Sequence, residues 1–412
     1  MKLRLSMLLF AAACALLTPA MAGQPIKVTL PADLQGDLGG VPYRILVPQN
    51  WNGTLLVYAH GYGESVTPPP LLAPLPADQQ TLFARGFALA ASRFDGSGWT
   101  VKEGMQNTVA LTAAFNGMVA PPQQTIIWGK SMGGLMAIGL AEKFPGHYDG
   151  AVALCPPAAG TPRRFDQTLD IALAYAVGFG WNPQWGTPGD LRDDLDFMTE
   201  VAPIMIPQMT PGNKGLWEFV RLVNRIPVAS FYPPANARAA VMYFAFAVRV
   251  ELENRAGGAI AENVGRTYTL TDQEKTYLAG FGVNADLLLQ QMNSSTKFTS
   301  DRNARNYVEH YFDPSGRINV PVLTLHTIGD PIAIPNNESA YFETVEQQGN
   351  ADLLMQQFTN GQGHCTFTTQ QDVAGIDAMI HWLETGNRPD PSVFFPATLG
   401  FVPDYFPGPW PW

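Results

Sequence analysis

The chain has 412 residues, with 25 lysines and arginines against 35 aspartates and glutamates, so its formal net charge is −10 at pH 7. An acidic chain without a basic run is poorly suited to bind nucleic acid or other anionic polymers. The length exceeds one ordinary hydrophobic core, which predicts two domains or one large domain with an insertion.

The first 22 residues have the pattern of a secretory signal peptide. Residues 1–4 are basic, residues 5–17 form an apolar run too short to span a bilayer, and residues 20–22 (AMA) form a small-x-small cleavage site. We expect cleavage before Gly23 and a protein exported to the periplasm or the medium, without a stable membrane anchor. The alternative is that this segment stays in place as an anchor.

Strands and helices alternate after the signal segment. Patterns of buried strands and amphipathic helices predict strands at 26–30, 41–47, 54–59, 87–92, 125–128 and 150–155, with helices near 79–85, 102–118 and 135–143. Alternation of this kind indicates a mostly parallel sheet with right-handed crossovers.

The alternation stops at residues 156–157 (PP) and resumes with a strand at 320–326. Between them, helix starts are predicted at 187–190 (TPGD) and 271–274 (TDQE), together with a helix over 237–252 that is apolar on two faces. We expect a helical cap over the carboxyl ends of the strands, where α/β sheets place their sites. The two-faced helix belongs either to the core of the cap or to the wall of a substrate cleft.

The remaining elements complete the predicted organisation. We expect a helix near 337–348, a strand at 352–358, a helix near 370–385, and a tail rich in proline and aromatic residues. The tail packs on the surface or, alternatively, forms a carbohydrate or polymer platform. The predicted segments are a signal peptide (1–22), the first part of an α/β core (23–155), a helical cap (156–317), the second part of the core (318–390) and the tail (391–412).

The stretch 129–134 (GKSMGG) is the most informative motif. It lies between a predicted strand and a predicted helix, and a serine on such a sharp turn between glycines presents its hydroxyl above the sheet. Glycine is frequent in this chain, so the G-x-S-x-G pattern alone is weak and its context carries the weight. Ser131 is therefore the candidate nucleophile.

A neutral serine hydroxyl needs a base to take its proton and an acid to orient that base. His364 lies in a glycine-rich loop after the last predicted strand, and Asp330 follows the strand before it. The chain order Ser131, Asp330, His364 is that of α/β-hydrolases. Asp330 precedes a proline and could instead mark an ordinary turn, and Asp95 is an alternative acid.

The oxyanion of an acyl-transfer reaction needs backbone donors. We expect these from the N–H of Met132, at the start of the helix after the serine, and from Tyr62 in the loop 60–63 (HGYG). The Tyr62 ring would line the acyl site, with Trp99 and Phe244 as further substrate-binding candidates. His60 is expected to shape its loop rather than act as the base.

Two other polar residues are expected to be structural. Lys130 should point away from the site into a salt bridge; alternatively it lowers the pKa of the serine or meets an anionic substrate. His326, on the strand before Asp330, is expected to be packed.

Cys155 and Cys365 are the only cysteines outside the signal segment, so we expect no metal centre, and no motif calls for a cofactor. Cysteines often pair in an oxidising compartment, and both lie in loops at the same predicted sheet edge. A disulfide is expected, with two separate buried thiols as the alternative.

The chain resembles the α/β-hydrolase superfamily over residues 54–155 and 320–385. The resemblance implies an α/β fold with a mostly parallel central sheet and a large helical cap inserted after the strand that follows the serine turn. Residues 364–365 (HC) are similar to the pattern of feruloyl esterases and tannases, in which cysteines beside the serine and histidine are bridged. Residues 131–134 and 60–63 also look like exported esterases and polyester depolymerases.

The leading hypothesis is an exported serine esterase without metal or cofactor, acting on a hydrophobic or aromatic ester or a short oligoester. The alternative is a serine peptidase of the prolyl oligopeptidase or prolyl aminopeptidase kind. A peptidase of this kind that binds a free N-terminus needs acidic residues near the serine. The candidates in the cap are Asp193, Asp194, Glu251 and Glu253, although their pattern is that of helix faces exposed to solvent. A third hypothesis is a silent binding protein on the same scaffold. The oligomeric state is not predicted.

Overall fold

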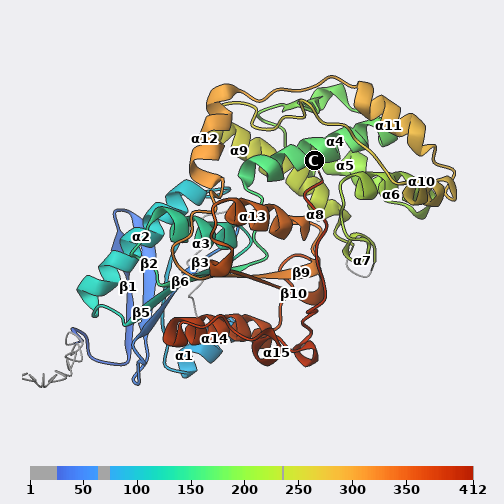
Figure 1. Ribbon diagram of the computed structural model, residues 1–412. Helices are drawn as coiled ribbons and strands as arrows, with labels where there is room; N and C mark the ends of the chain where they lie inside the picture. Colours follow the sequence, from blue (N-terminus) through green and yellow to red (C-terminus); the bar gives the residue numbers. More distant parts are fainter. Residues whose placement is uncertain (1–25, 64–74, 234–235, 412) are drawn as a thin grey trace, which may run out of the picture.

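The computed structural model describes residues 26–63, 75–233 and 236–411, so the predicted signal peptide lies outside the described residues. A twisted sheet has helices on both faces, and further helices gather beyond one end of it (Figure 1). None of the helices in the described ranges combines the length and the apolar run that crossing a bilayer requires.

The central sheet has eight strands in the order β1-β2-β4-β3-β5-β6-β9-β10. Strand β2 pairs antiparallel with β1 and β4, and the remaining pairs are parallel. This order, with helices as crossovers, is the α/β-hydrolase fold, which confirms the predicted fold class. The bounds are β1 (Ala32–Leu38), β2 (Val41–Val47), β3 (Thr54–Ala59), β4 (Ala88–Ser92), β5 (Gln124–Lys130), β6 (Gly150–Leu154), β9 (Val322–Gly329) and β10 (Leu354–Gln362).

Helices cover both faces of the sheet, which is why its strands read as continuous apolar runs. Along β5, Ile127 joins the apolar cluster on the face of α2 and α3, whereas Ile126 and Trp128 join the cluster under α1 and α14. Alternate side chains of one strand are thus buried in opposite layers. The covering helices are α1 (Ala77–Ala84), α2 (Val101–Met118), α3 (Met132–Lys143), α13 (Asn336–Gln347), α14 (Thr369–Thr385) and α15 (Pro391–Phe394).

The first strand was predicted at residues 26–30, which is wrong: β1 begins at Ala32. Its position is fixed by a two-residue hairpin in which Gly39 and Gly40 have φ values of 66° and 91°. The N–H of Gly40 donates to Asp37 Oδ1 at 2.6 Å. A diglycine turn of this kind sets the strand register, and this overrides the apolar pattern of the preceding residues.

Between β6 and β9 lies a segment that we call the helical insertion, residues 156–317. It has its own apolar cluster, which includes Tyr175, Trp217 and Phe246. Its elements are α4 (Thr161–Phe179), α5 (Ala202–Met205), α6 (Lys214–Val223), α7 (Val228–Phe231), α8 (Arg238–Tyr243), α9 (Arg249–Ala256), α10 (Asp272–Ala279), α11 (Ala285–Ser294), α12 (Arg302–Phe312) and the short strands β7 (Gly186–Thr187) and β8 (Asp190–Leu191).

One of the two predicted helix starts in the insertion is wrong. Residues 187–190 turn between β7 and β8, because Thr187 Oγ1 accepts the N–H of Asp190 at 3.1 Å and closes the turn. The other is confirmed, since Thr271 and Glu274 form a reciprocal capping box at the start of α10. The same residue types cap a helix or close a turn, and the residues that follow decide between them.

The helix that is apolar on two faces consists of α8, a π-helical turn (Phe244–Val248) and α9. Met242 and Phe246 pack into the cluster of the insertion, whereas Val248 and Leu252 pack into the cluster between the sheet and α2. Both faces are therefore buried because this helix joins two cores. Phe244 is only partly buried and contacts both clusters.

The C-terminal tail ties the sheet edge to the insertion. Phe401 pairs with Thr359 of β10, and Asn336 Nδ2 donates to the carbonyls of Gly408 at 2.9 Å and Pro409 at 2.8 Å. Trp410 is buried in the cluster of the insertion, whereas Phe406 is 84% exposed. The tail packs on the body of the protein along much of its length.

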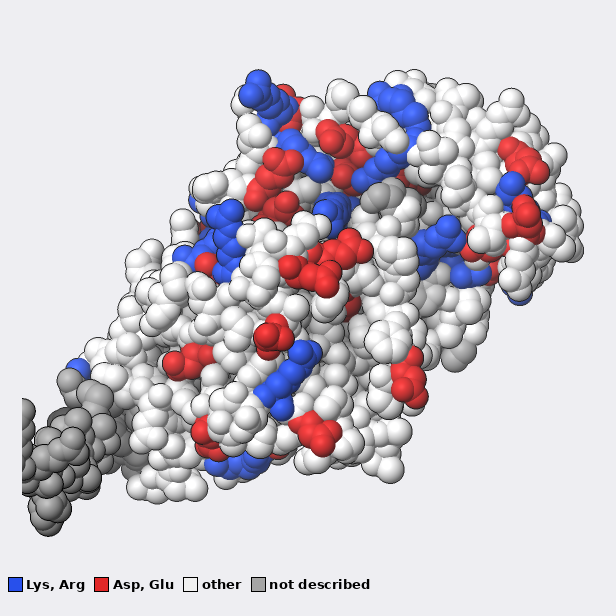
Figure 2. Space-filling view, in the orientation of Figure 1, with Lys and Arg blue, Asp and Glu red and all other residues white. Residues whose placement is uncertain are grey.

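Acidic and basic side chains are interspersed over the face seen in Figure 2, many of them on the helical insertion.

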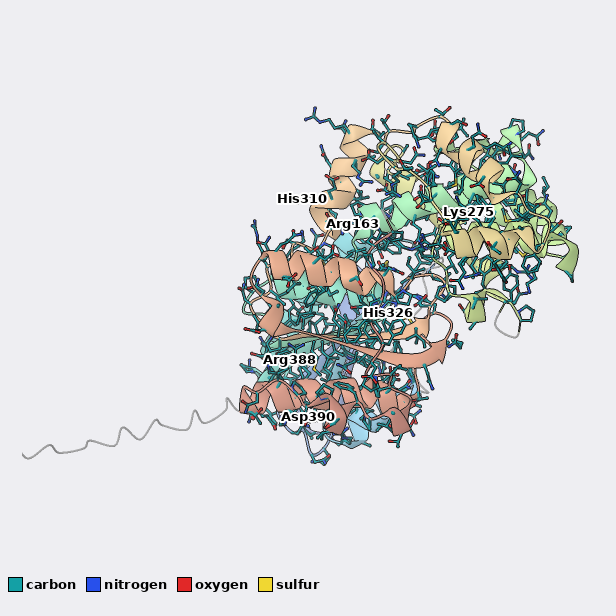
Figure 3. All side chains as sticks on the ribbon, turned by 45° about the vertical axis from the view of Figure 1, so that its right-hand side comes forward. Arg163, Lys275, His310, His326, Arg388 and Asp390 are labelled. Atoms are coloured by element: carbon teal, nitrogen blue, oxygen red, sulfur yellow. A yellow bond between two sulfur atoms is a disulfide. The ribbon has the colours of Figure 1, made fainter. Side chains whose placement is uncertain are left out.

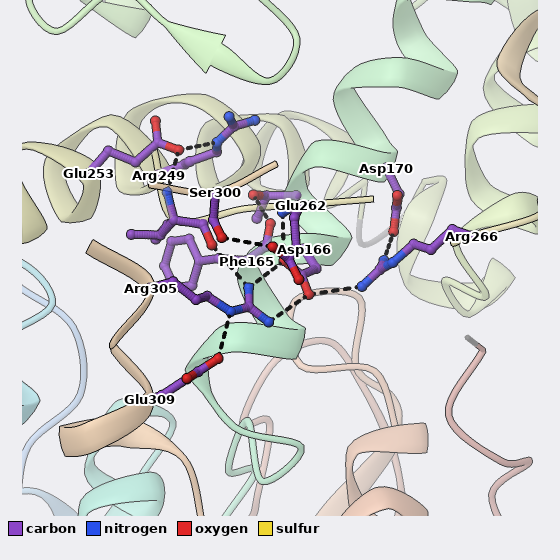
Figure 4. Close-up of polar contacts among 12 residues, drawn as sticks. Phe165, Asp166, Asp170, Arg249, Glu253, Glu262, Arg266, Ser300, Arg305 and Glu309 are labelled. Atoms are coloured by element: carbon purple, nitrogen blue, oxygen red, sulfur yellow. Dashed lines mark hydrogen bonds and ion pairs between the residues drawn. The ribbon is translucent and has the colours of Figure 1, made fainter. Parts of the chain in front are cut away.

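Beneath the surface, α4 carries a network of buried carboxylates (Figure 4). Asp166 pairs with Arg305 at 2.7 Å and with Arg266 at 2.9 Å. Asp170 pairs with Arg266 and accepts the hydroxyl hydrogen of Tyr268. These pairs hold α4 to α12 and to the loop before α10.

This network predicts a pH-dependent stability. Burial raises the pKa of Asp170 from 3.8 to about 7, and the charge of Asp166 adds to this increase. Arg266 and Tyr268 lower the pKa, but their effect is smaller than that of burial. Between these values the folded chain holds a proton that the unfolded chain has lost, so the free energy of unfolding falls as the pH rises. In Asp170→Asn this slope should flatten by up to about 1.4 kcal/mol per pH unit.

Urea denaturation of both proteins at several pH values between 4.5 and 7.5 measures the effect. Arg266 keeps Asp166 as its partner in the variant, and substitution of the exposed Asp95 by asparagine is the matched control. Parallel slopes for wild type and Asp170→Asn would contradict a raised pKa.

Candidate active site

Ser131 sits on the tight turn between β5 and α3. Its φ is 58°, a left-handed conformation that a non-glycine residue rarely adopts. Glycine is required beside it, because a Cβ at Gly133 would lie 2.0 Å from the carbonyl oxygen of Ala59. The N–H of Ser131 donates to the carbonyl of Leu154 at 2.9 Å, which anchors the turn to β6. The serine side chain is consequently held, partly exposed, at the carboxyl end of the sheet.

The structure brings the three predicted side chains together. His364 Nε2 lies 2.7 Å from Ser131 Oγ, and His364 Nδ1 lies 2.6 Å from Asp330 Oδ2. Both contacts are within hydrogen-bonding distance. The imidazole is 23% exposed and Asp330 is fully buried. A hydroxyl, an imidazole and a carboxylate in this order can activate the hydroxyl as a nucleophile.

The loops that carry the imidazole and the carboxylate are fixed by backbone contacts. Asp330 Oδ1 accepts the N–H groups of Ile332 at 2.8 Å and of Ala333 at 2.9 Å, which leaves Oδ2 for the histidine. The N–H of Gly363, in the residue before the histidine, donates to the carbonyl of Gly329 at 3.0 Å. Asp95, the alternative acid, is exposed and is not the partner of His364.

Cys155 and Cys365 form a disulfide with a Cα–Cα distance of 5.4 Å. The disulfide was the first of the two alternatives for these cysteines, and the separate buried thiols are excluded. It links the end of β6 to the residue after His364, so it ties the histidine loop to the strand that anchors the serine turn. Among the described residues, the one group with metal-ligand spacing is Cys155, His364 and Cys365. The disulfide removes both thiolates from that group.

The predicted oxyanion loop lies against the serine. A Cβ at Gly61 would lie 3.3 Å from the carbonyl oxygen of Lys130 and 3.6 Å from Ser131 Cβ, so the backbone leading to Tyr62 runs beside the nucleophile. Met132 begins α3, where backbone N–H groups point out of the helix. His60 bonds to the carbonyls of Gly61 and Arg93, consistent with a role in shaping this loop.

The three aromatic candidates form one cluster. The Phe244 ring lies 6.0 Å from Tyr62 and 6.1 Å from Trp99, centre to centre. Tyr62 and Phe244 are partly exposed, but Trp99 is only 1% exposed. Its indole N–H donates to Thr161 Oγ1 at 3.1 Å, and its backbone N–H donates to Glu251 Oε2 at 2.8 Å. Trp99 thus packs against Tyr62 and Phe244 from the buried side of the cluster.

Lys130 points away from the serine, as predicted. Its ammonium contacts Asp372 at 2.7 Å and Asp78 at 3.0 Å. Burial opposes protonation of this lysine, but the two carboxylates outweigh it and raise its pKa. The bridge joins β5 to α1 and α14 on the far face of the sheet.

His326 is packed, as predicted, and Figure 3 shows it near the end of the sheet that faces the insertion. It is fully buried, with ring nitrogens 2.8 Å from Glu338 Oε1 and 2.7 Å from the carbonyl of Ala333. Burial lowers its pKa, but the hydrogen bond and charge of Glu338 outweigh this and raise it. The histidine fixes the segment after Asp330.

Not all of the acidic residues considered for binding a free N-terminus are exposed to solvent. Glu251 accepts the backbone N–H of Trp99 and forms an ion pair with Arg255. Glu253 is buried and forms an ion pair with Arg249, with 2.9 Å between Oε1 and Nε. Asp193 and Asp194 are exposed. The two glutamates are therefore occupied by structural contacts.

Sequence reasoning missed Arg164, in the first turn of α4. Its guanidinium is buried and lies 4.8 Å from the centre of the Phe244 ring. An arginine near a helix start is ordinary in sequence, and only the packing of the insertion on the sheet shows that it is buried here.

A match to a family model supports a hydrolase. The family model "Esterase: Putative esterase" matches residues 85–219. The o-phthalyl amidase of Xanthobacter agilis is 24% identical, covering 86% of this chain and 88% of that protein. Similar solved structures include feruloyl esterase B of Aspergillus oryzae (TM-score 0.44, 16% identity, 87% of this chain and 82% of that chain) and an esterase of Pyrococcus furiosus (TM-score 0.43, 12% identity, 87% and 91%).

The strand order shows the α/β-hydrolase fold. The family match over residues 85–219 supports hydrolase activity for a chain with that fold.

Proposed function

We propose that the protein is a serine hydrolase that cleaves carboxylic esters through an acyl-enzyme. The observation that carries the proposal is the hydrogen-bonded series Ser131, His364 and Asp330 at the carboxyl end of the sheet. Ser131 attacks the ester carbonyl while His364 takes its proton. His364 then protonates the leaving alcohol and activates the water that releases the acid.

The groups around the serine have proposed roles of their own. The N–H groups of Met132 and Tyr62 stabilise the oxyanion, and the positive end of α3 adds to that field. Tyr62 and Phe244 line the acyl site, and Trp99 positions them. These aromatic rings favour a hydrophobic or aromatic acyl group, in a small ester or a short oligoester. No step of this chemistry calls for a metal or a cofactor.

The helical insertion is proposed to act as a cap that restricts access to the serine. Export to the periplasm or the medium is proposed from the pattern of residues 1–22, and the disulfide between Cys155 and Cys365 favours it because such bonds persist in oxidising compartments.

Amide hydrolysis is the second candidate, favoured by the similarity to the o-phthalyl amidase of Xanthobacter agilis. Matched pairs of 4-nitrophenyl esters and 4-nitroanilides of the same acids distinguish the two. We expect kcat/KM for the ester to exceed that of the amide by far more than tenfold. Cleavage of both at comparable rates would replace the esterase proposal with an amidase, and cleavage of neither would overturn both.

A further inference from the structure

Arg164 carries a buried positive charge close to the proposed active site. The residue is 2% exposed, and its single hydrogen bond within the described residues runs from Nη1 to Gln167 Oε1 at 3.3 Å. No carboxylate of those residues forms an ion pair with it. Its neighbour Arg163, labelled in Figure 3, marks the start of α4, where the insertion meets the part of the protein that contains the sheet.

The other buried charges of α4 are all neutralised. Asp166 has Arg266 and Arg305, and Asp170 has Arg266 and Tyr268, as Figure 4 shows for the ion pairs. Arg164 differs from them, because its main contacts are the neutral Gln167 and the face of Phe244.

Asp330, whose charge acts on Arg164, already has other partners. Burial lowers the pKa of Arg164 to about 10, and the charge of Asp330 acts in the opposite direction. Asp330 uses Oδ1 for two backbone N–H groups and Oδ2 for His364. The guanidinium therefore stays charged near pH 7, beside the proposed catalytic groups, and no anion in the described parts of the chain is hydrogen-bonded to it.

A buried charge without a paired anion is unfavourable, and an incoming carboxylate would supply the missing partner. Phe244 connects the guanidinium to the acyl site, because its ring lies 4.8 Å from Arg164 Cζ and 6.0 Å from the Tyr62 ring. The planar donors of arginine match a carboxylate in a two-bonded geometry.

We propose that Arg164 binds a second carboxylate on the acyl group of the substrate, so that the enzyme prefers monoesters of aromatic dicarboxylic acids. This inference rests on the proposed function and adds the substrate class. In the bound state the carboxylate meets the guanidinium, the ring lies along Phe244 and Tyr62, and the ester carbonyl faces Ser131. Lys130, the cation first considered for an anionic substrate, is held away by Asp78 and Asp372.

The test uses the monoethyl esters of the three benzenedicarboxylic acids and, as neutral planar counterparts, the three ethyl nitrobenzoates. Comparing each variant with wild type on the same substrate cancels the intrinsic reactivity of that ester. For the best carboxylated isomer, Arg164→Met should lower kcat/KM by about 100-fold or more, mainly through KM. The matching nitrobenzoate should change less than about threefold, and Arg164→Lys should restore part of the loss.

An equal loss on charged and neutral substrates would overturn the proposal, since Arg164 would then act through Asp330 or through folding. If Arg164→Met does not fold, the wild-type protein still decides: a KM for every carboxylated ester at or above that of its nitro counterpart contradicts the proposal. Ser131-dependent hydrolysis of the nitrobenzoates without preference for a carboxylate refutes only this inference. Absence of hydrolysis of all six esters also refutes this inference, and the proposed function falls with it only if 4-nitrophenyl esters are not cleaved either.

Discussion

Replacing Ser131 by alanine should lower kcat for 4-nitrophenyl esters by about four to six orders of magnitude while leaving the fold intact. The hydroxyl lies 2.7 Å from His364 Nε2, so its removal takes away the proposed nucleophile of the acyl-enzyme. The serine makes its structural contacts through the backbone, by its N–H to Leu154 and its carbonyl to Leu135, and alanine keeps them. The positive φ of the turn is equally demanding for both residues.

Steady-state kinetics and thermal unfolding of wild type and Ser131→Ala provide the measurement. A variant with unchanged Tm that retains more than about one per cent of kcat would contradict the assignment of Ser131 as nucleophile, because water attack alone is far slower.

Asp330→Asn is the second change with a large expected effect, a loss of about 10⁴-fold in kcat. The asparagine carbonyl should keep the position of Oδ1, which accepts the N–H groups of Ile332 and Ala333. The amide NH₂ must then face His364 Nδ1, where the wild-type carboxylate accepts a hydrogen bond. It would donate instead, which forces the imidazole proton onto Nε2 and prevents it from accepting the serine proton.

The control for this variant is Asp95→Asn, which changes an exposed carboxylate in a neighbouring loop. Activity should be unchanged in the control. A similar loss in both variants, or activity near wild type in Asp330→Asn, would mean that Asp330 does not orient the histidine.

The parts of the site set by local backbone geometry were predictable from the sequence. The glycines around Ser131 are needed because of the approach of Ala59, and that requirement is visible as a motif. The positions of Asp330 and His364 followed from where two strands end, since parallel strands present their carboxyl ends at the same edge. The interpretation of Cys155 and Cys365 as a pair rested on the same argument.

Features that depend on packing between distant segments were not predictable. Trp99 was expected beside the substrate, but α4 and α9 cover it, through Thr161 and Glu251. The burial of Arg164 likewise arises only when α4 packs near Phe244. No local pattern encodes these contacts, because each joins residues far apart in the chain.

Two other predictions were wrong because a tight turn was not recognised. Residues 26–30 have the apolar pattern of a strand, yet the diglycine turn at residues 39–40 moves the first strand to Ala32–Leu38. At Thr187 a good capping residue closes a hairpin instead of starting a helix. In both cases a tight turn outweighed the propensity of its neighbours.

The most direct test of the central claim is covalent labelling with a fluorophosphonate, followed by mass spectrometry of the peptides. The arrangement of Ser131, His364 and Asp330 predicts one adduct per chain, on Ser131, and strongly reduced labelling in His364→Ala. An unlabelled wild-type protein, or an adduct on a different residue, would contradict it.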